Sequence, residues 1–177
     1  MKLIIGLGNP GDKYKNNRHN VGHQYIEFLI KELTNIELTD SSSNPQCVNA
    51  LINNKEILLC KSDKFMNNSG FSVKKVLAKH QNIPLENVYI VHDDLDIPLG
   101  KFKIDHATGP KLHNGIKSIE ETLKTRDFWR IRIGVDARKP DTWIDGEKYV
   151  LSDFTKEEQK IIKLIFPNII QKLSTML

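Results

Sequence analysis

The sequence predicts an α/β fold with a largely parallel sheet, because strand-like segments alternate with helix-like segments along the whole chain. The 177 residues can bury one sizeable core. No internal repeat, low-complexity segment or long linker divides them. We therefore expect residues 1–177 to form a single domain.

Apolar periodicity and turn residues mark the elements in the first half of the chain. An apolar, partly β-branched run stopped by glycine predicts a strand over residues 2–8. Apolar side chains then recur at helical spacing over residues 20–34, where Asn20 is a plausible N-cap. After a polar loop at 35–46, we expect strands over 47–53 and 56–61, joined by the turn-prone Asn53 and Asn54, and a helix over 69–80.

The second half continues the alternation. An apolar run predicts a strand over 88–92 that leads into the polar segment DDLD. Further strands are expected over 100–104 and 129–135 and a helix over 114–124, with a loop at 105–112 and an irregular segment at 137–148. Thr155 and Glu158 have the spacing of a capping box, which predicts a last helix over 156–175. Pro167 lies inside this helix and should kink or split it.

The composition is that of a soluble globular protein, with 39% apolar and 27% charged residues. We find no signal peptide, and no apolar run approaches the ~20 residues of a membrane span. We therefore expect a cytoplasmic protein without membrane contact, in which Cys47 and Cys60 stay reduced. The net charge of +4 and the pI of about 9.0 fit a polyanionic partner.

Three local patterns permit other chemistries. Gly6, Gly8 and Gly11 match the dinucleotide-binding pattern GxGxxG, but no helix is predicted to open at this turn. His19 and His23 have the spacing of zinc ligands on a helix, without the accompanying glutamate or an evident third ligand. The carboxylates of the segment HDDLD could bind Mg²⁺ for phosphoester hydrolysis, although the chain has no P-loop.

A metal-free hydrolytic site is the alternative that uses these polar groups together. The candidates all fall at expected strand ends or helix starts, which converge on one crevice in an α/β sheet. They are Asn9, His19, Asp93, Asn114 and either Asn67 or Asn68. His19 could take a proton from water, Asp93 could fix its tautomer, and the amides could steady an oxyanion. Because no serine or cysteine is placed as a nucleophile, direct attack by water is the simpler prediction.

Five sequence blocks lie in order over most of the chain. They are residues 3–22, FMNNSG at 65–70, HDDLDIPLGKFK at 92–103, LHNGIKSI at 112–119 and RIRIG at 130–134. Together they resemble bacterial peptidyl-tRNA hydrolase. The resemblance implies a monomeric single-domain α/β protein whose twisted mixed sheet carries helices on both faces. It also implies hydrolysis of the ester between a peptide and the 3′ end of tRNA, without a metal or cofactor.

The resemblance assigns roles to individual residues. His19 matches the general base for water, Asp93 the carboxylate that orients it, and Asn9 an asparagine at the scissile region. The residues expected to bind the peptide end or line the crevice are Tyr14, Met66, Asn67, His113 and Asn114. Asn67 is preferred over Asn68 because it directly follows Met66. Lys101, Lys103 and Arg132 match basic positions that hold a tRNA phosphate.

The chain departs from the family pattern beside the expected site. The usual glycine run before His-Asn-Gly is replaced by the longer segment ATGPKL at 107–112, which removes positive-φ freedom. Lys111 in this segment is a further candidate for a phosphate contact. The alternative function is a non-catalytic RNA-binding relative, such as the plant chloroplast splicing factor on this scaffold. Retention of His19, Asp93 and the asparagines argues against it.

Overall fold

The structure is a computed structural model that describes residues 1–34, 46–139, 141 and 143–177. The expected polar loop therefore lies almost entirely outside the described residues. The strands are β1 (Lys2–Gly6), β2 (Gln46–Ile52), β3 (Lys55–Lys61), β4 (Val88–Pro98), β5 (Phe102–His106) and β6 (Trp129–Asp136). The α-helices are α1 (Val21–Thr34), α2 (Ser69–Lys79), α3 (Asn114–Leu123), α4 (Gly146–Val150) and α5 (Lys156–Met176). Two short 3₁₀ turns, η2 (Arg18–Asn20) and η3 (Met66–Asn68), precede α1 and α2.

The six strands form one mixed sheet in the order β2-β3-β1-β4-β6-β5. The central strand β1 runs parallel to β3 and β4, and β4 runs parallel to β6. The edge strands β2 and β5 are antiparallel to their neighbours. This arrangement confirms the predicted mixed, largely parallel sheet.

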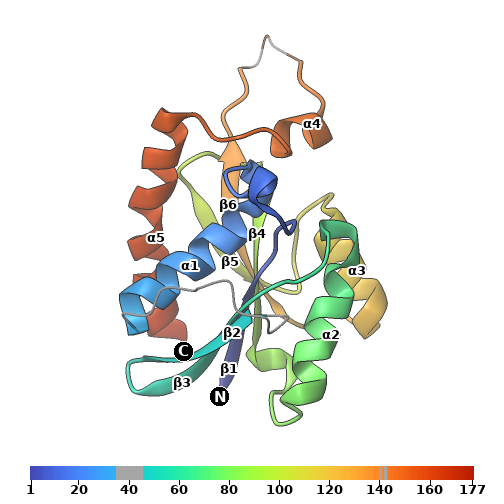
Figure 1. Ribbon diagram of the computed structural model, residues 1–177, viewed down its shortest axis with the longest axis vertical. Coiled ribbons are helices and arrows are strands. Elements are labelled where there is room, and N and C mark those ends of the chain that lie inside the picture. Colours follow the sequence, from blue (N-terminus) through green and yellow to red (C-terminus); the bar gives the residue numbers. More distant parts are fainter. Residues whose placement is uncertain (35–45, 140, 142) are drawn as a thin grey trace.

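Helices cover both faces of the sheet, as Figure 1 shows. The alternation of side chains along β1 divides the core between these faces. Ile4 packs with apolar residues of α1 and α5, whereas Leu3 and Ile5 pack with apolar residues of α2 and α3. Full burial of such a side chain contributes about 1.5–3 kcal/mol, so both layers hold the sheet in place.

Most predicted elements are present, and several boundaries differ. The strand expected over residues 88–92 continues to Pro98, so the carboxylates of HDDLD lie within β4 rather than in a turn. Of the kink or split expected at Pro167, the split is absent, because α5 is one helix over Lys156–Met176. Ile162, Phe166 and Ile169 of α5 are buried in the core, and this burial outweighs the roughly 3 kcal/mol that an interior proline costs. The capping box of Thr155 and Glu158 is confirmed.

The two cysteines do not stay reduced, as the sequence led us to expect, but form a disulfide between Cys47 and Cys60. The hairpin of β2 and β3 turns through Asn53 and Asn54, both at positive φ, and places the two cysteines directly opposite each other. Their Cα atoms are 4.2 Å apart. The pairing follows from this cross-strand register. The expectation of a cytoplasmic location loses the support that free thiols provided.

Among the helices that the structure describes, none combines the length and the apolar character that a membrane span needs.

Candidate active site

A cleft of about 740 Å³ opens where the parallel strands end. Asn9 follows β1, Met66 follows β3, and Asp93 lies in β4, so the same edge of the sheet supplies all three. The predicted residues that line the cleft are Asn9, His19, Met66, Asn67, Asp93, His113 and Asn114. Asn68, the alternative to Asn67, lines it as well. Apolar side chains, including Phe65, Leu112 and Leu151, complete the walls.

The glycines after β1 serve close packing rather than nucleotide binding. A Cβ on Gly6 would lie 2.2 Å from the carbonyl oxygen of Gly22, so these glycines let β1 and α1 approach closely. A Cβ on Gly8 would lie 2.6 Å from the His23 ring. The helix α1 begins only at Val21, well beyond the turn. The dinucleotide-binding hypothesis is therefore not supported.

Asn9 is held by a reciprocal pair of hydrogen bonds with Asn20. The backbone N–H of Asn9 donates to Asn20 Oδ1, and Asn20 Nδ2 donates to the carbonyl of Asn9, both at 2.9 Å. The Oδ1 atom of Asn9 accepts from the backbone N–H of Met66 at 2.8 Å. Since Oδ1 is occupied, the Nδ2 donors are the part of Asn9 available to a ligand.

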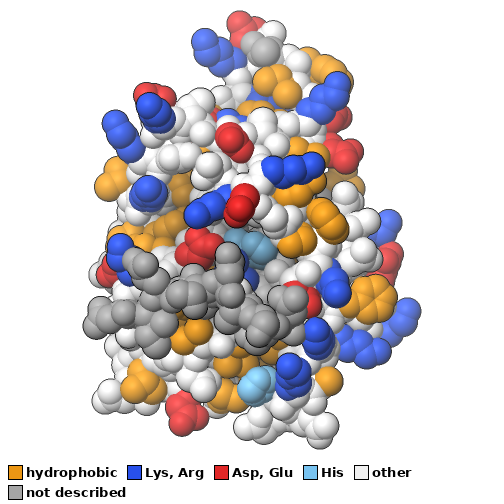
Figure 2. All heavy atoms as spheres, viewed as in Figure 1, with side chains coloured by type: hydrophobic (Ala, Val, Ile, Leu, Met, Phe, Trp, Pro, Cys, Tyr) orange, Lys and Arg blue, Asp and Glu red, His pale blue; other side chains and the backbone are white. Residues whose placement is uncertain are grey.

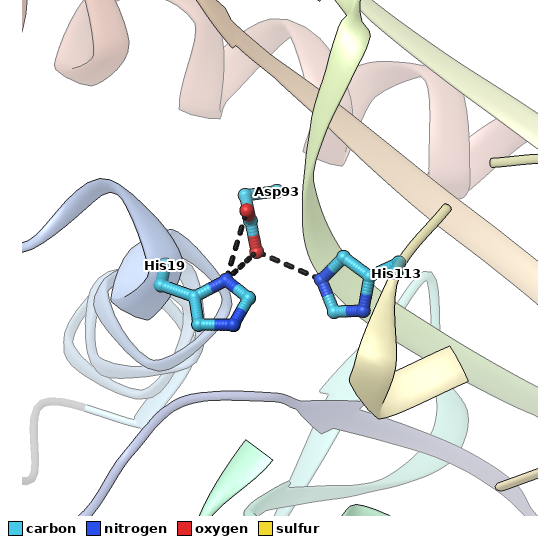
Figure 3. Close-up of side chains that lie close together, drawn as sticks. All are labelled: His19, Asp93 and His113. Atoms are coloured by element: carbon cyan, nitrogen blue, oxygen red, sulfur yellow. Dashed lines mark hydrogen bonds and ion pairs between the residues drawn. The ribbon is translucent and has the colours of Figure 1, made fainter. Parts of the chain in front are cut away.

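The Asp93 carboxylate lies between two imidazoles that come from different parts of the chain, as Figure 3 shows. His19 Nδ1 lies 2.9 Å from Asp93 Oδ1 and 3.0 Å from Oδ2. On the other side, His113 Nε2 lies 2.9 Å from Asp93 Oδ1. With Nδ1 of His19 bound to the carboxylate, its Nε2 is the ring nitrogen left to face a ligand.

Burial and charge act in opposite directions on this cluster. Burial disfavours the charged form of His19, but the neighbouring Asp93 carboxylate outweighs it, so the pKa of His19 lies above its ordinary value of 6.5. Burial would raise the pKa of Asp93, yet the two imidazoles and their hydrogen bonds hold it well below its ordinary range. Asp93 is therefore an anion at neutral pH and supplies a counter-charge to the His19 imidazolium, whose pKa it raises.

The two metal hypotheses from the sequence are not supported. His23 is buried, bonds Ser62 Oγ at 3.0 Å, and has its pKa lowered to about 3 by burial and by Lys61. It does not join His19 in a zinc site. Within β4, Asp94 Oδ2 accepts from Arg132 Nε at 2.7 Å instead of converging with Asp93 on a cation.

His19, Asp93 and His113 do offer ligand atoms that all lie within 4.8 Å of one another. Their facing atoms are joined by the hydrogen bonds described above. An ion among them would have to replace the protons that hold the three side chains together. The donor set therefore fits a proton-transfer site better than a metal site.

Comparison with known proteins identifies the family. The peptidyl-tRNA hydrolase profile matches residues 3–177. The chain belongs to this family. It is similar to the peptidyl-tRNA hydrolase of Listeria monocytogenes, with 42% identity over 162 residues, covering 90% of this chain and 83% of that protein. The corresponding protein of Halalkalibacterium halodurans is 40% identical over 162 residues, covering 92% and 85%. The crystal structure of peptidyl-tRNA hydrolase from Acinetobacter baumannii has a TM-score of 0.84 at 29% identity, covering 97% and 86%.

Membership of the peptidyl-tRNA hydrolase family makes this protein a hydrolase, as the sequence predicted. One residue expected to line the crevice of such an enzyme lies beside it instead. Tyr14 is not among the residues that line the cleft. Its ring packs edge-on against Phe65, which does line it, with 6.1 Å between the ring centres. Tyr14 therefore supports one wall from behind.

The basic residues expected to hold tRNA differ in whether their charged groups are free to bind a phosphate. Arg132 is buried and donates to Asp94 Oδ2 at 2.7 Å and to Asp105 Oδ2 at 2.8 Å, so two carboxylates already neutralise it. Lys101 and Lys103 are exposed. Lys111 is also exposed, with its Nζ 3.8 Å from Asp96 Oδ1. Figure 2 shows further basic side chains gathered over α2.

Sequence reasoning missed two residues that place this family's site. Asn20 was expected to cap α1, but it lies in η2, and its side chain bonds Asn9 instead. Arg18, beside His19, is buried and donates to the carbonyl oxygens of Ser152 at 3.1 Å and of Asp153 at 2.8 Å. It thereby ties the His19 segment to the chain between α4 and α5. Only the adjacency of these polar residues to His19 hinted at such roles.

Proposed function

We propose that this protein hydrolyses the ester bond between a peptide and the 3′ end of tRNA, with His19 as the general base for water. The observation that carries the proposal is the His19–Asp93 pair in a cleft that Asn9 also lines. The names of the relatives supply the substrate class. No serine or cysteine lines the cleft among the described residues, which supports direct attack by water.

The proposed reaction moves one proton through His19. Nε2 takes a proton from water as the water oxygen bonds to the ester carbonyl carbon. The Asp93 carboxylate accepts the Nδ1–H and stabilises the imidazolium. The Nδ2 donors of Asn9, which are not used by Met66, could stabilise the developing oxyanion. When the carbon–oxygen bond to the ribose breaks, the 3′ oxygen receives the proton from Nε2, which releases the peptide acid and free tRNA.

Peptide recognition is assigned to the exposed asparagines of the cleft. Asn67 and Asn114 present amide groups that can hydrogen-bond the peptide backbone. A free aminoacyl ester carries an ammonium group where the peptide has an amide. Moving the charged ammonium group from water into a cleft lined by neutral amides is costly, so the free ester should react poorly.

We also propose that the protein is monomeric and cytoplasmic.

The proposed function is tested by comparing two substrates that differ only at the amino group. We expect an N-acetylated aminoacyl-tRNA to be hydrolysed far faster than the same aminoacyl-tRNA with a free amine, in the presence of a chelator. Equal rates on the two substrates would contradict the proposed recognition of the peptide amide. Binding of tRNA without any hydrolysis would instead favour the non-catalytic relative, although the assembled His19–Asp93 pair argues against it.

For tRNA binding, we predict that Lys101 and Lys103 hold a phosphate, whereas Arg132 does not. The double change of Lys101→Ala and Lys103→Ala should raise KM and leave kcat nearly unchanged, because phosphate contacts supply affinity rather than chemistry. Loss of two phosphate contacts should reduce the salt dependence of binding by roughly 1.5 units in the log–log slope. The measurement is KM between low and moderate salt. Lys160→Ala with Lys163→Ala, on the exposed side of α5, is the matched charge control. An equal effect from both pairs would refute a specific site.

A further inference from the structure

His113 uses both of its ring nitrogens, and its partners determine where its proton lies. The backbone N–H groups of Gly115 and Ile116 donate to His113 Nδ1 at 3.1 and 3.2 Å. This makes His113 the N-cap of α3. A backbone N–H can only donate, so Nδ1 must be the acceptor and carries no proton.

The other nitrogen then carries the proton of the ring. Nε2 donates to Asp93 Oδ1 at 2.9 Å. To become charged, His113 would have to place a second proton on Nδ1, where two N–H donors already point, and α3 would lose its cap. The hydrogen bonds thus hold His113 as the neutral Nε2–H tautomer, with its side chain only 4% exposed.

His19 differs from His113 in the one respect that matters for proton transfer. Its Nδ1 faces the same carboxylate, but among the described residues its Nε2 has no hydrogen-bond partner. His19 therefore has a free nitrogen in the cleft, and His113 has none.

We infer that His113 is a positioning residue for the proposed hydrolysis: it fixes the Asp93 carboxylate and the first turn of α3, and it takes no proton itself. The same ring thereby sets the start of the helix whose first residue, Asn114, lines the cleft. This assignment rests on the proposed function, and it gives His113 a role besides the expected one of lining the crevice.

The inference predicts how His113 affects the charge seen by His19. The hydrogen bond that His113 donates to Asp93 partly offsets the negative charge of the carboxylate. Asp93 therefore stabilises the protonated form of His19 less strongly than it would without His113. The titratable and charged groups that act on this cluster are His92 and Asp93 of β4, His19 of η2, Glu147 of α4 and Arg132 of β6. The ring of His92 stacks edge-on against His113 at 4.7 Å, and burial holds the pKa of His92 well below 6.5.

His113→Asn separates the bond to Asp93 from the cap of α3. Asparagine is a good N-cap, so the helix start survives, but its shorter side chain cannot reach Asp93. We expect kcat to fall roughly 10- to 100-fold, as for loss of a hydrogen bond to a charged group, with a small change in KM. The acidic limb of the pH–rate profile should move to higher pH, because the carboxylate of Asp93, no longer bonded to His113, then raises the pKa of His19 further. His113→Ala, which loses the bond to Asp93 and the cap of α3, should also lower the melting temperature.

The tautomer itself is tested by ¹⁵N NMR of the histidine rings in the unmodified protein. We expect His113 to remain an Nε2–H imidazole over the pH range in which His19 titrates. Protonation of His113 Nδ1 in that range would overturn the inference whatever the activity on peptidyl-tRNA. An unshifted pH profile with wild-type kcat in His113→Asn would overturn it as well. His106→Asn, at an exposed histidine of β5, is the control.

Discussion

Replacing His19 with alanine should lower kcat by roughly 10²- to 10⁴-fold on an N-blocked aminoacyl-tRNA, the range typical of a lost general base. The reason is geometric. Among the described residues that line the cleft, His19 alone combines a bond from Nδ1 to a carboxylate with an unpartnered Nε2. Substrate affinity should change little, because the asparagines and lysines assigned to binding remain. The measurement is single-turnover hydrolysis with a chelator present.

The control for His19→Ala is His106→Ala, which removes an exposed histidine paired with Asp127. It should leave turnover unchanged. Thermal unfolding of both variants checks that the fold is intact, and a small change is expected since His19 lies partly exposed at the cleft. Undiminished turnover in a folded His19→Ala protein would remove this residue from the mechanism.

Replacing Asp93 with asparagine should reduce kcat by a similar factor, roughly 10²- to 10⁴-fold, because the imidazolium formed in the reaction loses its counter-charge. Asparagine keeps the size of the side chain and one acceptor oxygen. The change therefore tests charge rather than packing. Asp94→Asn, at the next residue of β4, is the matched control for a lost carboxylate, because Asp94 pairs with Arg132 rather than with His19.

Asp93→Asn should shift the pH dependence of the rate in a defined direction. His19 acts as a base only when neutral, and its pKa in the intact protein lies above 6.5 because Asp93 outweighs burial. The rate of the intact enzyme should therefore fall as the pH drops through a value above 6.5. Without the carboxylate, burial dominates and lowers the pKa of His19, so the acidic limb of the residual activity should move to lower pH. A limb that stays in place would contradict the role assigned to Asp93.

Local sequence patterns predicted most of the secondary structure correctly. The apolar run at residues 2–8, the periodic segments that became α1 and α2, and the capping box of α5 depend on neighbours within a few residues. The errors arose where a distant partner decided the outcome. Burial of α5 against the sheet carried the helix through Pro167, and pairing with β6 extended β4 to Pro98.

In the candidate site, too, local patterns identified the residues, whereas distant partners decided which of them are free to act. Residue types and their positions at strand ends indicated Asn9, His19, Asp93 and Asn114, and the resemblance added Met66 and His113. All of them line one cleft. The sequence did not show that Arg132 is already paired, because the carboxylates that neutralise it, Asp94 and Asp105, lie on other strands, β4 and β5. Likewise, Cys47 and Cys60 became partners only through the register of a hairpin.

The sequence by itself determined the fold class, the family and the chemical groups available, because these depend on local periodicity and on which residues occur in order. Tertiary structure decided how those groups act. A histidine's proton lies where its hydrogen-bond partners require, and the partners of His19 and His113 come from other segments of the chain. Two histidines that are chemically identical in the sequence thus become a base with a free nitrogen and a neutral donor that holds its carboxylate.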